Sequence, residues 1–442
     1  MPALPQHAAA SARHTYQPAF QTAAQRERNP SRNDCENILD TLSFLATSKL
    51  SGGIVQPTSR SNFIVLQPAR YFLTIAAIVG VVWIHGTALY AQSGNGGLKL
   101  DTGKDIYMAG CVSCHGPDGK GQPETLAGFQ RPSTFPDFTD CPGATPEPDI
   151  QWRSVITDGG PGRGFSQIMP SFKDMLTQDQ ISKVIEYLRS LCPVKAWPRG
   201  NLNLPLAMIT EKAYPENEVV ITGSYNAHGA PGGATTVIYE KRIGISSMIG
   251  AVVPYSFKQD SNGNHAALGD IALEFKRKMF DSLKTGSIFS LGGDISVPTG
   301  SRSVGTGGES ILFETFAAYG QLLPRDSFLQ LQTGFEFPVH PDKVPRAYFM
   351  RTAIGKTFST EGGLGRRWSP MLEIIADRDL VAGAKTNLDL APEIQIPLSR
   401  RMHILGSIGY RIPVNNTGNR PRQLMFYLLW DFPDGGLRQG WR

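Results

Sequence analysis

The stretch Cys111-Val112-Ser113-Cys114-His115 decides how the first half of this 442-residue chain is interpreted. Two cysteines at this spacing can each form a thioether with a vinyl group of haem, and the adjacent imidazole can then bind the iron. A redox Cys-x-x-Cys pair and half of a zinc site are the alternatives. Zinc would need two more ligands, but no second Cys-x-x-Cys or His-x-x-x-His follows, and a thioredoxin-like pair would follow a strand, whereas residues 103–110 have a helical pattern. The spacing therefore predicts one covalently attached haem c.

The residues around this motif follow a recognisable order. A turn-rich stretch comes directly after it at 116–121, and a Met-Pro pair, Met169-Pro170, lies further along. Residues 177–191 are predicted as a closing helix, because a threonine can cap its start and apolar residues recur along one face. This order of helix, Cys-x-x-Cys-His, Met-Pro loop and closing helix resembles a class I cytochrome c over about residues 97–192. The resemblance implies an all-α domain, placed here at 92–194.

The iron ligands are expected to be His115 and a methionine. His115 is the only histidine in this region, so a second histidine ligand within the domain is not available. Met108 precedes Cys111 by about one turn of the same helix and should not reach the opposite face of the haem. The family resemblance places the axial methionine in a Met-Pro segment, which favours Met169 and leaves Met175 as the alternative. A thioether ligand raises the reduction potential and suits electron transfer.

Two further cysteines, Cys141 and Cys192, lie in the cytochrome-like region. Attachment of haem c implies an oxidising compartment, in which a disulfide between them would persist. We therefore predict a Cys141–Cys192 disulfide, and two free thiols are the alternative. The fifth cysteine, Cys35, falls in a segment that we expect to be removed.

Residues 1–91 are interpreted as an N-terminal extension that ends in a signal peptide. Arg70 precedes an apolar core at 71–84, and Ala91 supplies a small residue at the expected cleavage site. An uncleaved anchor is the alternative, although a membrane-spanning helix needs about 20 apolar residues. Seven of the 43 Lys and Arg and four of the 38 Asp and Glu precede residue 92, which leaves 36 against 34. This balance gives no argument for nucleic-acid binding.

Beyond Pro198 the sequence alternates apolar and polar residues with period two. Ile271, Leu273 and Phe275, for example, alternate with polar or small residues, as in strands that have one apolar face. Twelve such segments are predicted, near 217–225, 234–243, 247–258, 269–279, 287–298, 310–322, 327–338, 346–359, 369–379, 386–398, 402–414 and 422–432. An even number of antiparallel strands of about ten residues is typical of an outer-membrane barrel.

The barrel is placed at 217–434, after an extended linker at 195–216 and before a tail at 435–442. Long and short connections alternate along it, with an exception at 360–368, and short turns belong on the periplasmic side. Acids on the polar face are expected to line the lumen: Asp270, Glu274, Asp294, Glu336, Glu373, Asp377, Asp389 and Glu393. Five basic residues could join them: Lys276, Arg351, Lys356, Arg378 and Arg411.

One segment of the barrel carries a second resemblance. Leu268-Gly269-Asp270-Ile271-Ala272-Leu273 and Pro298-Thr299-Gly300 resemble the outer-membrane family associated with phenol degradation. The resemblance implies a transport-type barrel. A soluble β-sandwich or a lipocalin-like barrel is the alternative, because such folds also alternate in hydropathy.

The sequence therefore predicts a multidomain protein, in which an all-α class I cytochrome c is followed by an antiparallel transmembrane barrel of about 12 strands. Its expected function is one-electron transfer by a periplasm-facing, mono-haem domain anchored in the outer membrane. Its expected partners are a periplasmic redox protein and outer-membrane lipid, and the barrel could pass a small-molecule solute. The alternative is a transport protein whose haem domain acts as plug or redox gate. A haem enzyme is not expected, because Met169 would occupy the sixth iron position.

Overall fold

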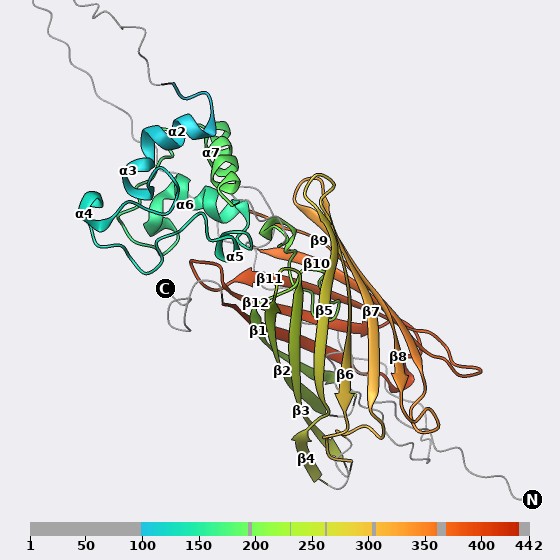
Figure 1. Cartoon of the computed structure of the whole chain (residues 1–442). Coiled ribbons are helices and arrows are strands. Elements are labelled where there is room, and N and C mark those ends of the chain that lie inside the picture. Colours follow the sequence, from blue (N-terminus) through green and yellow to red (C-terminus); the bar gives the residue numbers. More distant parts are fainter. Residues whose placement is uncertain are drawn as a thin grey trace, which may run out of the picture. The chain divides into compact units, whose positions relative to one another are not determined.

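The computed structural model describes residues 99–192, 197–229, 231–260, 263–302, 306–359 and 368–432 (Figure 1). The expected signal peptide with its apolar core at 71–84, Cys35 and the tail at 435–442 lie outside the described residues. No helix in the described ranges has both the length and the apolar character needed to span a membrane.

The first described part is a small helical domain. Its helices are α2 (Gly103–Gly110), α3 (Val112–His115), α4 (Glu124–Ala127), α5 (Cys141–Ala144), α6 (Asp149–Gly162) and α7 (Gln178–Ser190). Thr102 and Asp105 cap α2 reciprocally, and Thr177 and Gln180 do the same for α7. Local sequence therefore specifies where α2 and α7 begin.

Helices α2 and α7 pack directly against each other. A Cβ atom at Gly103 would lie 1.9 Å from the carbonyl oxygen of Lys183, so only glycine permits this approach. The core between the helices is apolar and consists of Ile106, Tyr107, Ile156, Ile181, Val184, Ile185 and Leu188. The apolar face predicted for the closing helix is thus the face that is buried.

The second part is an antiparallel sheet, preceded by the short 3₁₀ helix η1 (Gly200–Leu202). Its strands are β1 (Glu218–His228), β2 (Gly232–Ile243), β3 (Ser247–Asp260), β4 (Gly263–Leu268), β5 (Ile271–Ser282), β6 (Ser287–Val297), β7 (Leu312–Leu323), β8 (Ser327–Pro338), β9 (Ala347–Lys356), β10 (Ser369–Asp379), β11 (Asn387–Pro397), β12 (Ile404–Pro413) and β13 (Arg422–Asp431). A second 3₁₀ helix, η2 (Thr417–Asn419), lies between β12 and β13.

Twelve of these strands close into a barrel, as predicted. Strand β1 pairs with both β2 and β13, so the sheet has no open edge there. Strand β3 pairs with β5 along 247–252 and with β4 along 255–260. Strand β4 therefore only prolongs the end of β3, in a stretch that the sequence analysis assigned to a loop. The sequence analysis missed this short strand because it pairs with β3 alone and does not join two neighbouring strands of the barrel.

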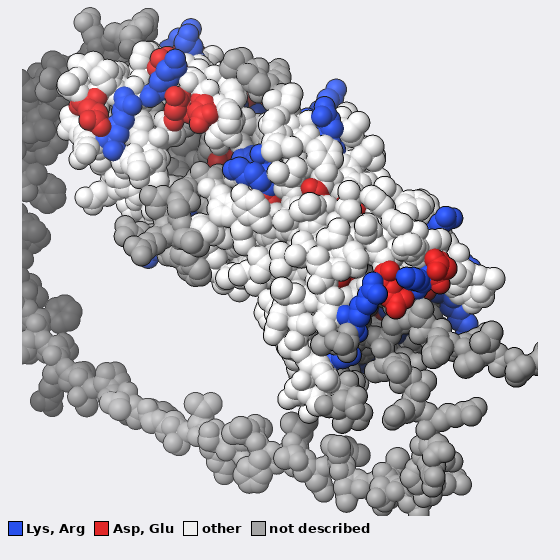
Figure 2. Space-filling model, turned by 60° about the horizontal axis from the view of Figure 1, so that its bottom comes forward, with Lys and Arg blue, Asp and Glu red and all other residues white. Residues whose placement is uncertain are grey.

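The two faces of the barrel differ in chemistry. Large apolar side chains are exposed on the outside, among them Tyr225, Phe257, Phe275, Phe313, Ile354, Ile374 and Phe426. On the face shown in Figure 2, the outer wall of the barrel carries a broad band of uncharged side chains. Such a band is what a lipid-facing barrel requires.

Most residues predicted to line the lumen do face inward. Buried examples are Asp270, Glu274, Glu336, Glu373, Asp377, Asp389, Glu393, Lys276 and Arg351. The expectation for Lys356 and Arg378 was wrong. Lys356 shares the outward face of β9 with Ile354, and Arg378 shares that of β10 with Ile374. The strict period of two, rather than charge, decides which way each side chain points.

Residues 203–216, which we call the plug, lie inside the barrel rather than forming part of an extended linker. All residues from 207 to 216 are buried. The plug enters and returns at one end, because Asn203 Nδ2 lies 3.4 Å from Glu216 Oε2. The plug forms no helix or strand. Its backbone N–H and C=O groups therefore form hydrogen bonds with polar side chains of the barrel wall, which take the place of water.

Several side chains of the barrel wall hold the plug. The carboxylate of Glu373 accepts hydrogen bonds from Ile209 N (3.1 Å), Thr210 N (2.7 Å) and Thr210 Oγ1 (2.6 Å). Gln332 Oε1 accepts from Glu211 N at 3.0 Å, and Gln395 Oε1 accepts from Leu206 N at 2.9 Å. Lys276 Nζ forms an ion pair with Glu211. The inward polar residues thus bind protein backbone in this conformation.

Candidate haem site

The Cys-x-x-Cys-His motif occupies the turn after α2 and the whole of α3. His115 N donates to Cys111 O at 2.9 Å, and Gln122 N donates to Cys114 O at 2.9 Å, so backbone bonds fix both ends of the motif. Tyr107, whose side chain is fully buried, donates its hydroxyl to Gly116 O at 2.6 Å. Cys111 and Cys114 are both free and half-buried. Two thiols and one imidazole are therefore held on a single rigid turn.

The His115 imidazole is neutral in its surroundings. Burial lowers its pKa to about 4, because an apolar environment disfavours the imidazolium form. The centroid of its ring lies 5.0 Å from the ring centroid of Phe135 and 5.2 Å from that of Phe138. No hydrogen-bond partner of Nδ1 lies among the described residues. A neutral imidazole has a lone pair that a metal ion can use.

Burial also raises the pKa of the Cys111 thiol to about 11, and the nearby Cys114 adds to this shift. Both effects disfavour a thiolate. The Cys111 thiol is therefore protonated at neutral pH and poorly suited to redox exchange, which needs a thiolate.

Met169 lies in the loop between α6 and α7. Gly160 N donates to Met169 O at 3.0 Å, and a Cβ atom at Gly160 would lie 2.0 Å from Ser166 O. Met169 packs against the same apolar cluster as Cys111. Met175 is 74% exposed and Met108 is 41% exposed. Of the three methionines in the domain, Met169 is thus the one that packs against the apolar cluster that Cys111 also contacts.

These residues fit a haem c group. They offer two uncommitted thiols, a neutral imidazole and a thioether, set against apolar side chains that include Phe138, Trp152 and Phe172. The His115 ring contacts Phe138 of this cluster, and Met169 packs against the cluster from a segment much further along the chain.

A disulfide joins the middle of this domain to its C-terminal end. The sulfur atoms of Cys141 and Cys192 are 2.01 Å apart, and the two residues are separated by 51 positions in the sequence. The bond connects the start of α5 to the residues that follow α7. It closes the long loop that contains Met169.

An arginine cluster that the sequence analysis missed lies beside this loop. The Arg189 guanidinium lies 3.7 Å from the ring centroid of Trp152, and its Nε donates to Asp149 Oδ1 at 2.8 Å. Trp152 in turn packs edge-on against Phe138, which contacts His115. The sequence did contain a signal for this contact. Asp149 lies in the first turn of α6 and Arg189 in the last turn of α7, where the helix dipole favours an acid and a base respectively.

Burial raises the pKa of Asp149, but Arg189 and Arg199 outweigh it and hold the pKa below its ordinary value. The Asp149 carboxylate is therefore ionised at neutral pH and ties α6 to α7 close to the haem-binding residues.

Comparison with known proteins identifies the family of the helical domain. Residues 100–192 match the family model for cytochrome c. This part of the chain is a cytochrome c domain. The family implies a haem cofactor and electron transfer rather than catalysis. A search of curated protein sequences gave no match.

Solved structures similar to this chain include two porins and a translocator domain. The KdgM porin shares 8% identity over 49% of this chain and 99% of its own, with a TM-score of 0.34. The NanC porin shares 8% over 48% and 98%, with a TM-score of 0.37. The translocator domain of the autotransporter NalP from Neisseria meningitidis shares 13% over 49% and 86%, with a TM-score of 0.31. The narrower resemblance to the phenol-degradation-associated family stays a prediction.

Proposed function

We propose that this protein is a mono-haem c-type electron carrier, anchored to the outer membrane by its barrel, with the haem domain in the periplasm. Cys111 and Met169 pack against one apolar cluster, and the His115 ring contacts Phe138 of that cluster; this arrangement carries the proposal. The barrel, whose outer wall is apolar, supports an outer-membrane location.

The residues would divide the work as follows. Cys111 and Cys114 would hold the haem through thioether bonds, and His115 Nε2 and Met169 Sδ would bind its iron. The bound haem supplies one-electron exchange. Phe138, Trp152 and Phe172 exclude water from the buried face, and the Cys141–Cys192 disulfide limits movement of the Met169 loop. With both ligands bound, the iron would have no position for a substrate.

The topology is inferred from the connections between strands. At the end where β1 begins and β13 ends, the connections 244–246, 283–286 and 324–326 are short, whereas 398–403 and 357–368 are longer. At the other end 229–231 is short, whereas 298–311, 339–346, 380–386 and 414–421 are longer. Short turns face the periplasm in barrels of this kind. Because the haem domain precedes β1, it belongs on the same side, where a periplasmic redox protein would exchange electrons with it.

The plug favours an anchoring role for the barrel over an open porin. Ten consecutive buried residues occupy the lumen. In the alternative function, a solute passes through the barrel and the haem domain acts as plug or redox gate. The segment that fills the lumen is instead the chain between that domain and β1, so passage would require residues 203–216 to move.

The decisive experiment follows the haem in cells that mature c-type cytochromes. Haem staining of a denaturing gel should show a heat-stable band of the full chain in the outer-membrane fraction. Protease added to intact cells should leave the stained domain whole, and protease added after opening the outer membrane should release it. Loss of stain on boiling would refute covalent attachment, and cleavage in intact cells would refute the periplasmic placement.

A further inference from the structure

The inner wall of the barrel carries many more acidic than basic side chains. Residues paired across neighbouring strands point to the same face of the sheet, so the pairing shows which side chains face the lumen. Among the strand residues whose side chains are described, thirteen acids and six bases lie on this inner face. The acids are Glu218, Glu240, Glu274, Asp281, Asp294, Glu314, Glu336, Glu373, Asp377, Asp379, Asp389, Glu393 and Asp431, and the bases are Arg242, Lys258, Lys276, Lys278, Arg351 and Arg411.

Several positive charges are used on few of these acids. Lys278 Nζ pairs with Asp281 at 2.6 Å on β5. Arg411 of β12 and Arg420, from the connection before β13, both pair with Asp389. These three cations therefore serve only two of the thirteen acids.

The plug does not supply the missing positive charge. Its charged residues are Glu211, Lys212 and Glu216, which add two negative charges and one positive. Lys212 Nζ pairs with Glu216 and lies 3.7 Å from Glu218 Oε1 on β1. It also acts on Glu240 of β2. The one positive charge of the plug is therefore shared among several acids.

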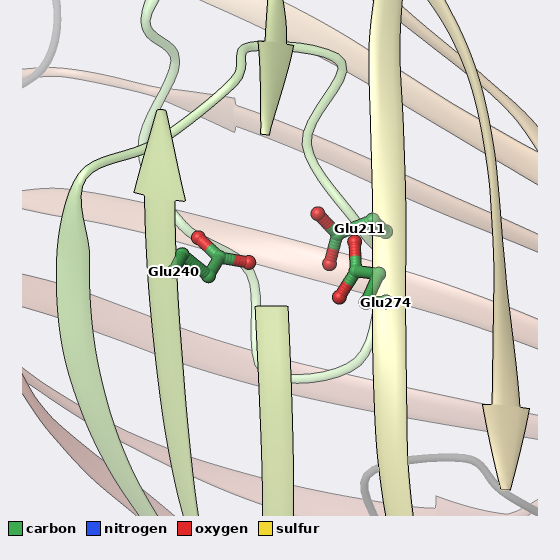
Figure 3. Close-up of side chains that lie close together, drawn as sticks. All are labelled: Glu211, Glu240 and Glu274. Carbon is green, nitrogen blue, oxygen red and sulfur yellow. The ribbon is translucent and has the colours of Figure 1, made fainter. Parts of the chain in front are cut away.

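Lys276 of β5 serves three acids at once. Its Nζ pairs with Glu211 of the plug. Oxygens of Glu211, Glu240 and Glu274 lie within 4.8 Å of one another (Figure 3), and all three acids act on Lys276. If the plug is withdrawn, Glu211 leaves with it, and Lys276 remains with two acids of the wall.

Three more acids, which we call the acidic row, lie next to each other on neighbouring strands. Asp294 (β6), Glu314 (β7) and Glu336 (β8) are direct cross-strand partners. Arg351 of β9 acts on both Asp294 and Glu314, so one positive charge faces the three negative charges of the row. The Glu314 side chain is 4% exposed, yet its Oε2 atom has no hydrogen-bond partner within the described parts of the chain. The row therefore presents a free acceptor to the lumen.

The plug shows what such carboxylates bind. Glu373 accepts hydrogen bonds from the backbone N–H groups of Ile209 and Thr210, and Glu393 Oε1 accepts from Met208 N at 3.3 Å. Withdrawal of the plug would take these donors away. A cationic solute can replace them, whereas an anion brings only further acceptors.

We propose that the barrel is selective for cations, so that the solutes it passes when the plug is displaced carry positive charge. Acidic side chains around a pore attract cations and exclude anions, and side chains of the lumen set the selectivity of membrane barrels. The inference rests on displacement of the plug and is independent of electron transfer by the haem domain.

Planar-bilayer recordings of the detergent-purified, full-length holoprotein in a potassium chloride gradient test the proposal. The reversal potential of the open events gives the ratio of K⁺ to Cl⁻ permeability. We expect K⁺ to be preferred roughly fivefold in the wild type and in Glu373→Gln, whose weaker hold on the plug should make openings more frequent.

Two pairs of substitutions, each made in the Glu373→Gln protein, separate the acidic row from net charge. Glu314→Gln with Glu336→Gln should lower the permeability ratio roughly twofold, because two charges leave the lumen. Asp179→Asn with Glu186→Gln removes the same charge from exposed positions of α7, outside the barrel, and should leave the ratio unchanged. Asp294→Asn replaces the first pair if that protein does not fold.

A permeability ratio of one or less in the wild type and Glu373→Gln overturns the proposal. A ratio that neutralising the acidic row leaves unchanged overturns it too, as does a barrel that conducts in none of these proteins. The haem stain and visible spectrum should be the same in all of them, so a failure of cation selectivity is distinguishable from a failure of the haem assignment.

Discussion

Replacing Glu373 with Gln should loosen the plug. The Glu373 carboxylate accepts three hydrogen bonds from Ile209 and Thr210. A hydrogen bond to a charged group contributes roughly 1.5–3 kcal/mol, against about 0.5–1.5 kcal/mol for a neutral one. Gln has nearly the same shape as Glu but carries no charge. Its amide NH₂ group is a hydrogen-bond donor and would face the donors of Ile209 and Thr210. A loss of about 3 kcal/mol shifts the ratio of displaced to seated plug by roughly 10²-fold.

Single-channel recording in a planar bilayer measures this ratio as the fraction of time that the barrel is open. The wild type should be closed almost always, and Glu373→Gln should open about a hundred times more often. Thr210→Val removes only one of the three bonds and should give a smaller increase. An open fraction for Glu373→Gln equal to that of the wild type, in protein that keeps its heat-shifted gel mobility, would refute the role of Glu373 as the latch.

Three further outcomes test the haem domain. Met169→Ala should keep the haem attached but lower its reduction potential and admit small ligands to the iron, which visible spectra with added imidazole would show; if Met175→Ala does this instead, the ligand assignment is wrong. Serine at both Cys141 and Cys192 should cost about 4 kcal/mol of unfolding free energy, from the loop-entropy relation for a separation of 51 residues; a urea titration with an unchanged midpoint would contradict this. The ion pairs that lower the pKa of Asp149 stabilise the fold above the unfolded pKa of about 4 and are lost as pH falls through the folded pKa; the stability difference between wild type and Asp149→Asn should therefore be constant above about pH 5 and shrink below pH 4.

Local patterns in the sequence were enough for most of the fold. Thr177 and Gln180 cap α7 through neighbouring backbone, and alternating residues such as Ile271 and Leu273 mark a strand by their own period. Both signals act over a few residues, so they can be read without knowing the tertiary structure.

The plug could not be predicted in this way. Residues 203–216 have no period, and their hydrogen-bond partners, such as Glu373 and Gln332, lie more than a hundred positions further along the chain. The same limit applies to Asp149 and Arg189, which are 40 residues apart and meet only when α6 and α7 pack. Lys356 was misplaced because charge was given more weight than its position in the strand.

The path of the plug has a consequence for assembly. Because Asn203 and Glu216 lie together at one mouth, the segment goes in and comes out through the same opening and passes through nothing. The plug is therefore not threaded through the barrel. Residues 203–216 can be withdrawn and reinserted with the twelve strands already sealed, whereas a segment running from one mouth to the other would have to be captured while the barrel was still closing.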